Sequence, residues 1–262
     1  MIDHVDYHVT DHCNCNCAGC NQFGCLAKPW CVSYEQFCNE WQLVHDKGLQ
    51  FNEIRILGGE TLLHPDLDKL LIKLRSLYPK TAIVVYTNGI LLEQQKEKLL
   101  PVFKEYNIIL FISKYPNLKL DYGKLKEGFP QVREWNVSSF MNTSFHAEPD
   151  FDRENSFNNC NNGHVWKCRF LKEGRLYPCS TIPTIKPLIQ YFPEIQNTSF
   201  GKMNIEENGI DIATHTIEEI ENFLNHSIPA CAFCNVWRAH YFEAWHPSEH
   251  KISEWFEKWT YQ

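Results

Sequence analysis

Short apolar runs alternate with stretches of helical hydrophobic periodicity over roughly the first 140 residues of the chain. An apolar run of four to eight residues that ends in small or polar residues is typical of a buried strand. Apolar residues at every third or fourth position instead predict an amphipathic helix. Their regular alternation predicts parallel βαβ units. The expected strands cover residues 5–9, 53–57, 82–86, 108–112 and part of 132–140.

The helices between these strands carry start signals. Ser33 followed by Gln36 predicts a capping box, and the apolar residues after it fall on one helical face. Asp66 is the expected N-cap of a second helix with its leucines facing inward. A third helix is expected near 92–105. The inward residues of the first two are Tyr34, Phe37, Cys38, Trp41 and Val44, then Leu67, Leu70, Leu71, Leu74 and Leu77.

The pattern changes after about residue 148, where Asp, Asn and Phe crowd together and the βαβ rhythm stops. A hairpin is expected from 165–171 and 175–178, with Gly174 suited to the positive φ of the turn. Thr216 and Glu219 predict the start of a helix that leads to Cys231. The chain therefore divides into segments 1–148 and 149–262, without a linker long enough to separate independent domains.

Composition narrows the class of protein. The chain has 262 residues, a net charge of −7 and 12 cysteines. Neither a long apolar stretch nor a signal peptide is evident, so we expect a cytoplasmic protein that does not bind membranes. In a reducing compartment, cysteines serve as metal ligands more often than as disulfides. The negative charge argues against nucleic acid as the main partner.

Cys13, Cys17 and Cys20 stand at C-x3-C-x2-C spacing, directly after the first expected strand. Three thiolates at this spacing can belong to a zinc site, but they also supply three of the four ligands of a four-iron cluster. One iron would then stay open for a substrate or cofactor. Three later strands end in small polar residues that could approach such a ligand closely. These residues are Gly58, Gly59 and Glu60, then Thr87 and Asn88, then Ser113.

The four motifs, in this order, resemble the radical S-adenosylmethionine (radical SAM) superfamily. The resemblance implies an α/β fold, a partial (β/α)6 TIM-like barrel, with a 4Fe-4S cluster at the carboxyl ends of the strands. It also implies that SAM binds the open iron and is cleaved reductively to a 5'-deoxyadenosyl radical, which abstracts a hydrogen atom from the substrate. Gly58–Glu60 would receive the methionine amino group, and Thr87, Asn88 and Ser113 the ribose and carboxylate. Gly19 departs from the aromatic residue usual in the family before the third cysteine.

A second set of cysteines comprises Cys160, Cys179, Cys231 and Cys234. Spacing alone does not decide between zinc and a fully ligated 4Fe-4S cluster. The arrangement resembles the twitch extension of the SPASM/twitch subgroup, which implies one auxiliary 4Fe-4S cluster in segment 149–262. Cys168 competes with Cys160 as a ligand. Because Trp166, Cys168 and Phe170 alternate along the expected strand, we interpret Cys168 as a buried apolar residue.

An auxiliary cluster with four protein ligands favours electron transfer over substrate binding. Twitch-bearing relatives include dehydrogenases of aminocyclitols, and stretches 57–65, 87–92 and 113–116 resemble small radical SAM proteins of bacterial surface-glycan gene sets. We therefore expect oxidation or epimerisation of a carbohydrate-type substrate, with a flavodoxin- or ferredoxin-type electron donor. Cys25 or Cys31 would return a hydrogen atom in an epimerase. The alternatives are maturation of a ribosomally made peptide and a non-catalytic iron-sulfur redox or sensor protein.

The aromatic residues near the C-terminus are interpreted as packing for the last helices rather than as a ligand platform. They are Trp237, Tyr241, Phe242, Trp245, Trp255 and Trp259.

Overall fold

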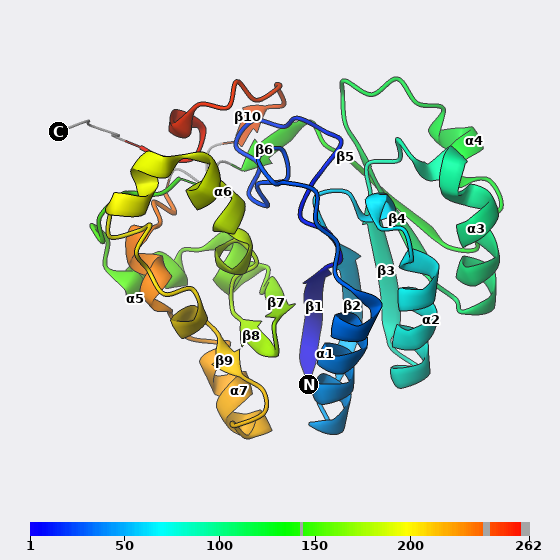
Figure 1. Cartoon of the computed structure of the whole chain (residues 1–262), viewed down its shortest axis with the longest axis horizontal. Coiled ribbons are helices and arrows are strands. Elements are labelled where there is room, and N and C mark those ends of the chain that lie inside the picture. The colour runs from blue at the N-terminus through cyan, green and yellow to red at the C-terminus, as the bar shows by residue number, and fades with distance from the viewer. Residues whose placement is uncertain (142–143, 238–241, 258–262) are drawn as a thin grey trace.

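The computed structural model describes residues 1–141, 144–237 and 242–257. Its main element is an eight-stranded sheet with the order β5-β4-β3-β2-β1-β7-β8-β9 (Figure 1). The strands are β1 (Ile2–His8), β2 (Phe51–Leu57), β3 (Ala82–Thr87), β4 (Ile109–Lys114), β5 (Val132–Asn136), β7 (Arg169–Lys172), β8 (Arg175–Tyr177) and β9 (Ile210–Asp211). β1 to β5 and β7 form one parallel array, whereas β8 pairs antiparallel with both β7 and β9. The parallel-rich α/β fold is therefore confirmed.

The end of the first segment differs from expectation. The strand predicted within 132–140 divides into β5 and β6 (Ser139–Met141), and β6 pairs with β10 (Phe242–Ala244) in a separate two-stranded sheet. The sixth parallel strand of the main sheet is β7, which lies beside β1 rather than beyond β5. Segment 149–262 thus contributes β7, β8 and β9 to the sheet that segment 1–148 begins. The boundary at 148 stays a prediction.

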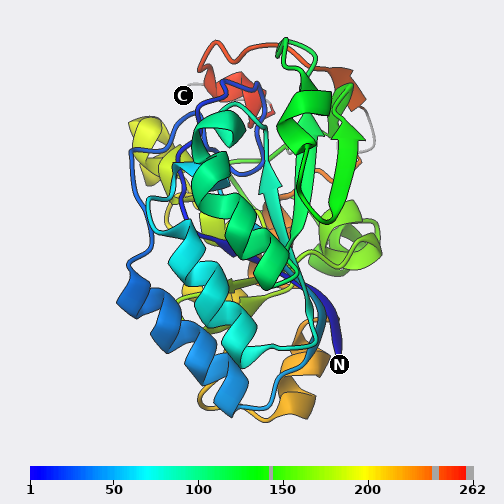
Figure 2. The same ribbon diagram turned by 90° about the vertical axis from the view of Figure 1, so that its right-hand side faces the viewer.

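Three long helices cover one face of the sheet, side by side in Figure 2. They are α1 (Tyr34–Asp46), α2 (Leu67–Leu77) and α3 (Leu92–Glu105), and a short α4 (Tyr122–Lys126) precedes β5. Ser33 Oγ accepts a hydrogen bond from Gln36 N at 3.1 Å, whereas the Gln36 side chain turns to Glu40, so the capping box is only half formed. Asp66 precedes α2 as predicted, but its side chain makes no N-cap hydrogen bond. Its carboxylate instead pairs with Lys69 Nζ at 2.6 Å.

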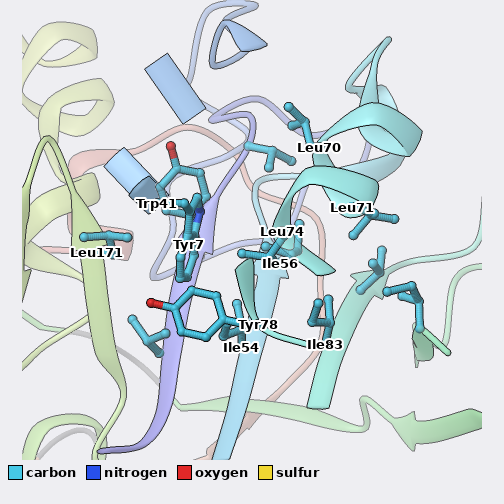
Figure 3. Close-up of a cluster of buried hydrophobic side chains, with 14 of the residues drawn as sticks. Tyr7, Trp41, Ile54, Ile56, Leu70, Leu71, Leu74, Tyr78, Ile83 and Leu171 are labelled. Carbon is cyan, nitrogen blue, oxygen red and sulfur yellow. The ribbon is translucent and has the colours of Figure 1, made fainter. Parts of the chain in front are cut away.

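The core between helices and sheet is apolar and aromatic. Tyr7 of β1 packs edge-on against Phe37 with ring centroids 5.3 Å apart, and it also contacts Trp41. Figure 3 shows Trp41 and Tyr7 facing the isoleucines of β2. Because side chains alternate along a strand, His4, Asp6 and His8 lie on the face opposite the helices. This polar face is buried as well.

The second segment begins with α5 (Arg153–Asn158) and a helical turn at Asn161–Val165. The strand predicted from residue 165 starts only at Arg169, so Trp166 and Cys168 lie outside it, contrary to their predicted alternation. Lys167 takes a left-handed φ of 51°, which interrupts any extended run there. The predicted hairpin itself is confirmed, with Gly174 at φ 71° in its turn.

The remaining helices are α6 (Lys186–Tyr191) and α7 (Ile217–Phe223), and α7 carries the predicted capping box of Thr216 and Glu219. Short 3₁₀ turns cover Thr61–Leu63, Ile182–Thr184, Pro193–Asn197, Glu206–Asn208, Pro229–Phe233 and Ile252–Glu254. A second apolar core joins this segment to the loop after β1 through Phe23 and Trp255, which are both fully buried. In the described ranges no helix has the length and apolar character needed to cross a membrane.

Candidate functional site

The loop between β1 and α1 carries Cys13, Cys17 and Cys20 at the carboxyl end of β1, in dark blue at the top of Figure 1. Cys17 is buried, and Cys13 and Cys20 are half-buried. A Cβ built on Gly24 would stand 2.9 Å from Cys13 Cβ, so the loop folds back tightly on itself. Cys15 N donates a hydrogen bond to Cys13 Sγ at 3.3 Å. The local fold therefore gathers these cysteines in one compact loop.

The three thiols influence one another electrostatically. Burial, followed by the charge of Cys17, raises the pKa of Cys20 to about 12. Hydrogen bonds from the Cys15 thiol and then from the Trp245 indole lower the pKa of Cys17, against the effect of burial. The structure thus brings the three predicted ligands together, and their role as ligands stays a prediction.

Gly58 and Gly59 let the turn after β2 pack directly on the cysteine loop. Gly59 N donates to Thr10 O, and Glu60 N donates to His12 O, both at 3.0 Å. A Cβ on Gly59 would lie 2.2 Å from His12 O, a distance that no side chain tolerates. The close approach that the glycines permit is therefore to the backbone of the cysteine loop, and it fixes that loop relative to β2.

The Glu60 carboxylate is buried and fully engaged by donors of the chain itself. Oε1 accepts from Leu62 N at 2.9 Å and from Thr87 Oγ1 at 2.7 Å, and Oε2 accepts from Asn88 N at 2.8 Å. Burial raises the pKa of Glu60, partly offset by these hydrogen bonds. Glu60 thus joins the ends of β2 and β3. Its predicted contact with the cofactor is not tested by this geometry.

Asn88 connects the end of β3 to the cysteine loop. Its Nδ2 donates to Asn14 Oδ1 at 2.7 Å and approaches Cys15 Sγ at 3.4 Å. Ser113 of β4 is half-buried at the same end of the sheet. The predicted cofactor residues therefore end neighbouring strands around the three cysteines, as the SAM-binding hypothesis requires.

Residues that are distant in sequence also reach the cysteine loop. Trp245 Nε1 donates to Cys17 Sγ at 3.2 Å, and Trp255 Nε1 donates to Cys20 O at 3.0 Å. The charges of the cysteine thiolates add to burial in raising the pKa of Tyr115. No local signal in the sequence links Trp245 or Tyr115 to the loop, so neither residue was predicted to lie here. Trp255 packs as interpreted, and Tyr241 and Trp259 lie outside the described residues.

Cys25 and Cys31, the candidate hydrogen-atom donors, occupy different surroundings. The Cys25 thiol points to Cys17 O at 3.6 Å, and its side chain packs against the second apolar core. Burial and the charges of Cys20 and Cys17 raise the pKa of Cys25. Cys31 forms an isolated bridge with Thr10 at the edge of the loop. Cys25 thus lies beside the three cysteines, and a catalytic role for either Cys25 or Cys31 stays a prediction.

The second cysteine set surrounds one cavity. Cys160, Cys179, Cys231 and Cys234 line it together with mostly apolar side chains such as Phe157 and Ile182. Including its mouth, this space measures about 350 Å³. Four thiols in an apolar cavity are a donor set suited to a 4Fe-4S cluster, whose charge is spread over the sulfur atoms. The residues present therefore fit the predicted auxiliary cluster.

Cys168 is absent from the residues that line this cavity. Burial followed by the Asp6 charge raises the pKa of its half-buried thiol to about 12, and the charges of Cys179 and Cys160 add smaller effects. Within the described ranges, no three His, Cys, Asp or Glu side chains are placed to hold a metal ion. Thiolates of a cubane each bind a different iron, so they stand farther apart than the ligands of one ion.

Next to the cysteine sites, the face of the sheet opposite the helices carries ionisable groups. Asp6 and Arg55 are register partners across β1 and β2, and Arg55 Nε donates to Glu53 Oε1 at 2.6 Å. Asp6 Oδ1 and His4 Nε2 are buried without a hydrogen-bond partner in the described part of the chain. Burial raises the pKa of Asp6 to about 7, and burial followed by the Arg55 charge lowers that of His4 to about 4.

Comparison with known proteins agrees with this geometry. Residues 7–123 match the family model of the Radical SAM superfamily. The chain is 33% identical over 101 residues to GTP 3',8-cyclase of Sulfurovum sp. (strain NBC37-1), covering 37% of this chain and 30% of that protein. It is 30% identical over 106 residues to the antilisterial bacteriocin subtilosin biosynthesis protein AlbA of Bacillus subtilis (strain 168). This match covers 40% of this chain and 23% of AlbA. The matched segment thus spans less than a third of these relatives.

The fold as a whole is similar to that of BtrN. The structure of BtrN in complex with AdoMet and 2-DOIA matches with a TM-score of 0.50 and 15% identity over 80% of this chain and 94% of that chain. BtrN in an open conformation matches with a TM-score of 0.50 and 18% identity. That match covers 90% of this chain and 92% of the BtrN chain. This likeness concerns the fold and extends beyond the matched domain. Together with the cysteine loop and the strand-end motifs, the family match identifies residues 7–123 as a radical SAM domain.

Proposed function

We propose that this radical SAM protein oxidises or epimerises a carbon of a carbohydrate-type substrate. The observation that carries the proposal is the cavity formed by Cys160, Cys179, Cys231 and Cys234, together with the polar residues His4, Asp6 and Arg55 on the sheet face opposite the helices. The fold is similar to that of BtrN, which was solved with AdoMet and 2-DOIA bound, so a fold of this kind can hold a second small molecule beside AdoMet. Since thiolate-bound clusters need reducing surroundings, we also propose a cytoplasmic location and a flavodoxin- or ferredoxin-type electron donor.

The radical SAM superfamily uses a 4Fe-4S cluster and SAM, which together supply the radical that abstracts a hydrogen atom. In this chain Cys13, Cys17 and Cys20 would hold that cluster. Glu60 fixes the end of β3 through its bonds to Thr87 and Asn88. These strand ends would then bind the amino acid and ribose parts of SAM close to the open iron.

The polar side chains that β1 and β2 place on this face of the sheet suit a substrate with several hydroxyl groups. Asp6 offers an unpartnered carboxylate oxygen, and Arg55 offers terminal nitrogens beyond its bond to Glu53. Oxidation of a secondary alcohol after hydrogen abstraction requires the loss of one more proton and one more electron. Asp6 would accept the proton, because its pKa of about 7 lets it change protonation near neutral pH. The four-cysteine site would accept the electron.

The first experiment counts iron. Anaerobically reconstituted protein should hold about eight irons, four for each cluster. Cys231→Ala should hold about four, whereas Cys168→Ala, the matched control, should keep the wild-type content. Equal iron in both variants, or zinc in place of iron, would remove the basis for an auxiliary cluster. With SAM and reductant, the wild type should release 5'-deoxyadenosine, and a protein that binds clusters without cleaving SAM would be a redox or sensor protein instead.

The second experiment identifies the substrate class. A perdeuterated sugar or aminocyclitol that is a substrate should transfer deuterium into 5'-deoxyadenosine. Transfer only from a deuterated peptide would favour peptide maturation, the alternative raised by the match to AlbA. Oxidation should give a ketone, whereas epimerisation in D2O should place a solvent deuteron on carbon. In that case Cys25→Ala or Cys31→Ala should abolish the deuteron incorporation.

A further inference from the structure

The C-terminal segment from Trp245 to Trp255 crosses the cysteine loop, where Figure 1 draws it in red above the dark-blue loop. Ala18 N donates to His246 O at 3.1 Å, and Pro247 forms an isolated bridge with Cys17. Asn16 adds a hydrogen bond from its Nδ2 to Ser248 O at 3.0 Å. The segment is therefore attached to the loop on both sides of Cys17, although more than 220 residues separate them.

Within this segment, Trp245 contacts a predicted cluster ligand directly. Its indole Nε1 lies 3.2 Å from Cys17 Sγ. An indole nitrogen can only donate, so the sulfur is the acceptor. The neighbouring backbone contacts at His246 and Pro247 hold the ring in place, and Cys17 is only 6% exposed. Water therefore has little access to replace the indole as a donor.

The other tryptophan of the segment makes a different bond. Trp255 Nε1 donates to the carbonyl oxygen of Cys20, not to its sulfur. That bond fixes the course of the loop and leaves the thiol untouched. In the described part of the chain, Trp245 is thus the tryptophan whose hydrogen bond ends on a ligand sulfur.

We propose that Trp245 is a positioning residue that raises the reduction potential of the cluster held by Cys13, Cys17 and Cys20. Reduction adds negative charge to the cluster, and part of this charge resides on the thiolate sulfurs. A donor fixed 3.2 Å from one sulfur stabilises the reduced form more than the oxidised form. The inference rests on the proposed function only in requiring that the three-cysteine cluster exists.

The test is a redox titration of the reconstituted protein followed by electron paramagnetic resonance, with dithionite as the reductant. The signal that changes when SAM is added belongs to the three-cysteine cluster, which separates it from any auxiliary signal. In Trp245→Phe the ratio of reduced to oxidised cluster at a fixed potential should fall on the order of tenfold, or about 59 mV for one electron. Trp166→Phe, at an exposed tryptophan outside the loop that carries Cys13, Cys17 and Cys20, should leave the ratio unchanged.

A direct measurement accompanies the titration. Wild-type protein exchanged into D2O and labelled with indole-15N tryptophan should show coupling of a deuteron and of 15N to the reduced cluster in pulsed magnetic resonance. An unshifted potential in Trp245→Phe with intact iron content would overturn the inference. If that variant fails to keep its cluster, absence of the 15N coupling in the wild type would overturn it instead. Protein that binds no iron at Cys13, Cys17 and Cys20 would refute the proposed function itself, a separate result.

Discussion

Replacing Asp6 by asparagine should stabilise the folded protein at neutral and higher pH. Asp6 is 6% exposed on β1, and its Oδ1 has no hydrogen-bond partner in the described ranges. Burial, opposed by the charge of Arg55, raises its pKa from 3.8 to about 7. The folded protein therefore holds this proton more tightly than the unfolded chain does. Ionising Asp6 in the folded state consequently costs free energy.

The sign and size of the effect follow from these pKa values. Below pH 4 both states are protonated, and Asp6 contributes nothing. As pH rises from about 4 to 7, the unfolded chain loses the proton first, so the stability of the wild type falls. At 1.36 kcal/mol per pKa unit, the full cost above pH 7 is roughly 4 kcal/mol. Asparagine avoids this cost. The free energy of unfolding of Asp6→Asn minus that of the wild type should therefore grow by about 2.5 kcal/mol between pH 5 and pH 8.

The assay is thermal unfolding followed by circular dichroism under anaerobic conditions at pH 5 and pH 8. For a chain of this size the growing advantage corresponds to roughly 5–10 °C in Tm. The comparison between wild type and variant cancels the contribution of His4, whose pKa is shifted in the opposite direction. Asp3→Asn, at an exposed position of the same strand, is the matched control. A Tm difference that does not change with pH, or a less stable variant at pH 8, would refute the reasoning.

Two further substitutions test the contacts that connect the strand ends to each other and to the cysteine loop. Glu60→Gln keeps the shape of the side chain but turns an amide donor toward Asn88 N, which also donates. The free energy of unfolding measured in urea should therefore fall by about 1.5–3 kcal/mol, and SAM binding should weaken. An unchanged free energy of unfolding would contradict the bonding of the carboxylate. Gly59→Ala should displace the cysteine loop, because the new Cβ would stand 2.2 Å from His12 O. Its iron content after reconstitution should drop by about four, and full iron retention would show that the loop does not depend on this contact.

Local patterns in the sequence predicted most of the barrel. Strand β3 and helix α3 occur where the alternation of apolar and polar residues placed them, at Ala82–Thr87 and Leu92–Glu105. These elements depend on burial of their own periodic side chains, which a single chain reveals. Asp66 shows the limit of local signals. As the residue before a helix it could cap, yet its carboxylate pairs with Lys69 instead.

The amino-acid sequence by itself determined which chemistry is available. The C-x3-C-x2-C spacing keeps three candidate metal ligands within eight residues, and glycines at strand ends let the backbone pack closely there. Both effects act between residues that are near each other in the chain. Only the tertiary structure decided which distant groups meet. It placed β7 beside β1, left Cys168 out of the lining of the four-cysteine cavity, and laid Trp245 against Cys17. Such contacts join residues far apart in the chain. Their free energy arises from packing and burial of the whole fold, and no local pattern encodes it.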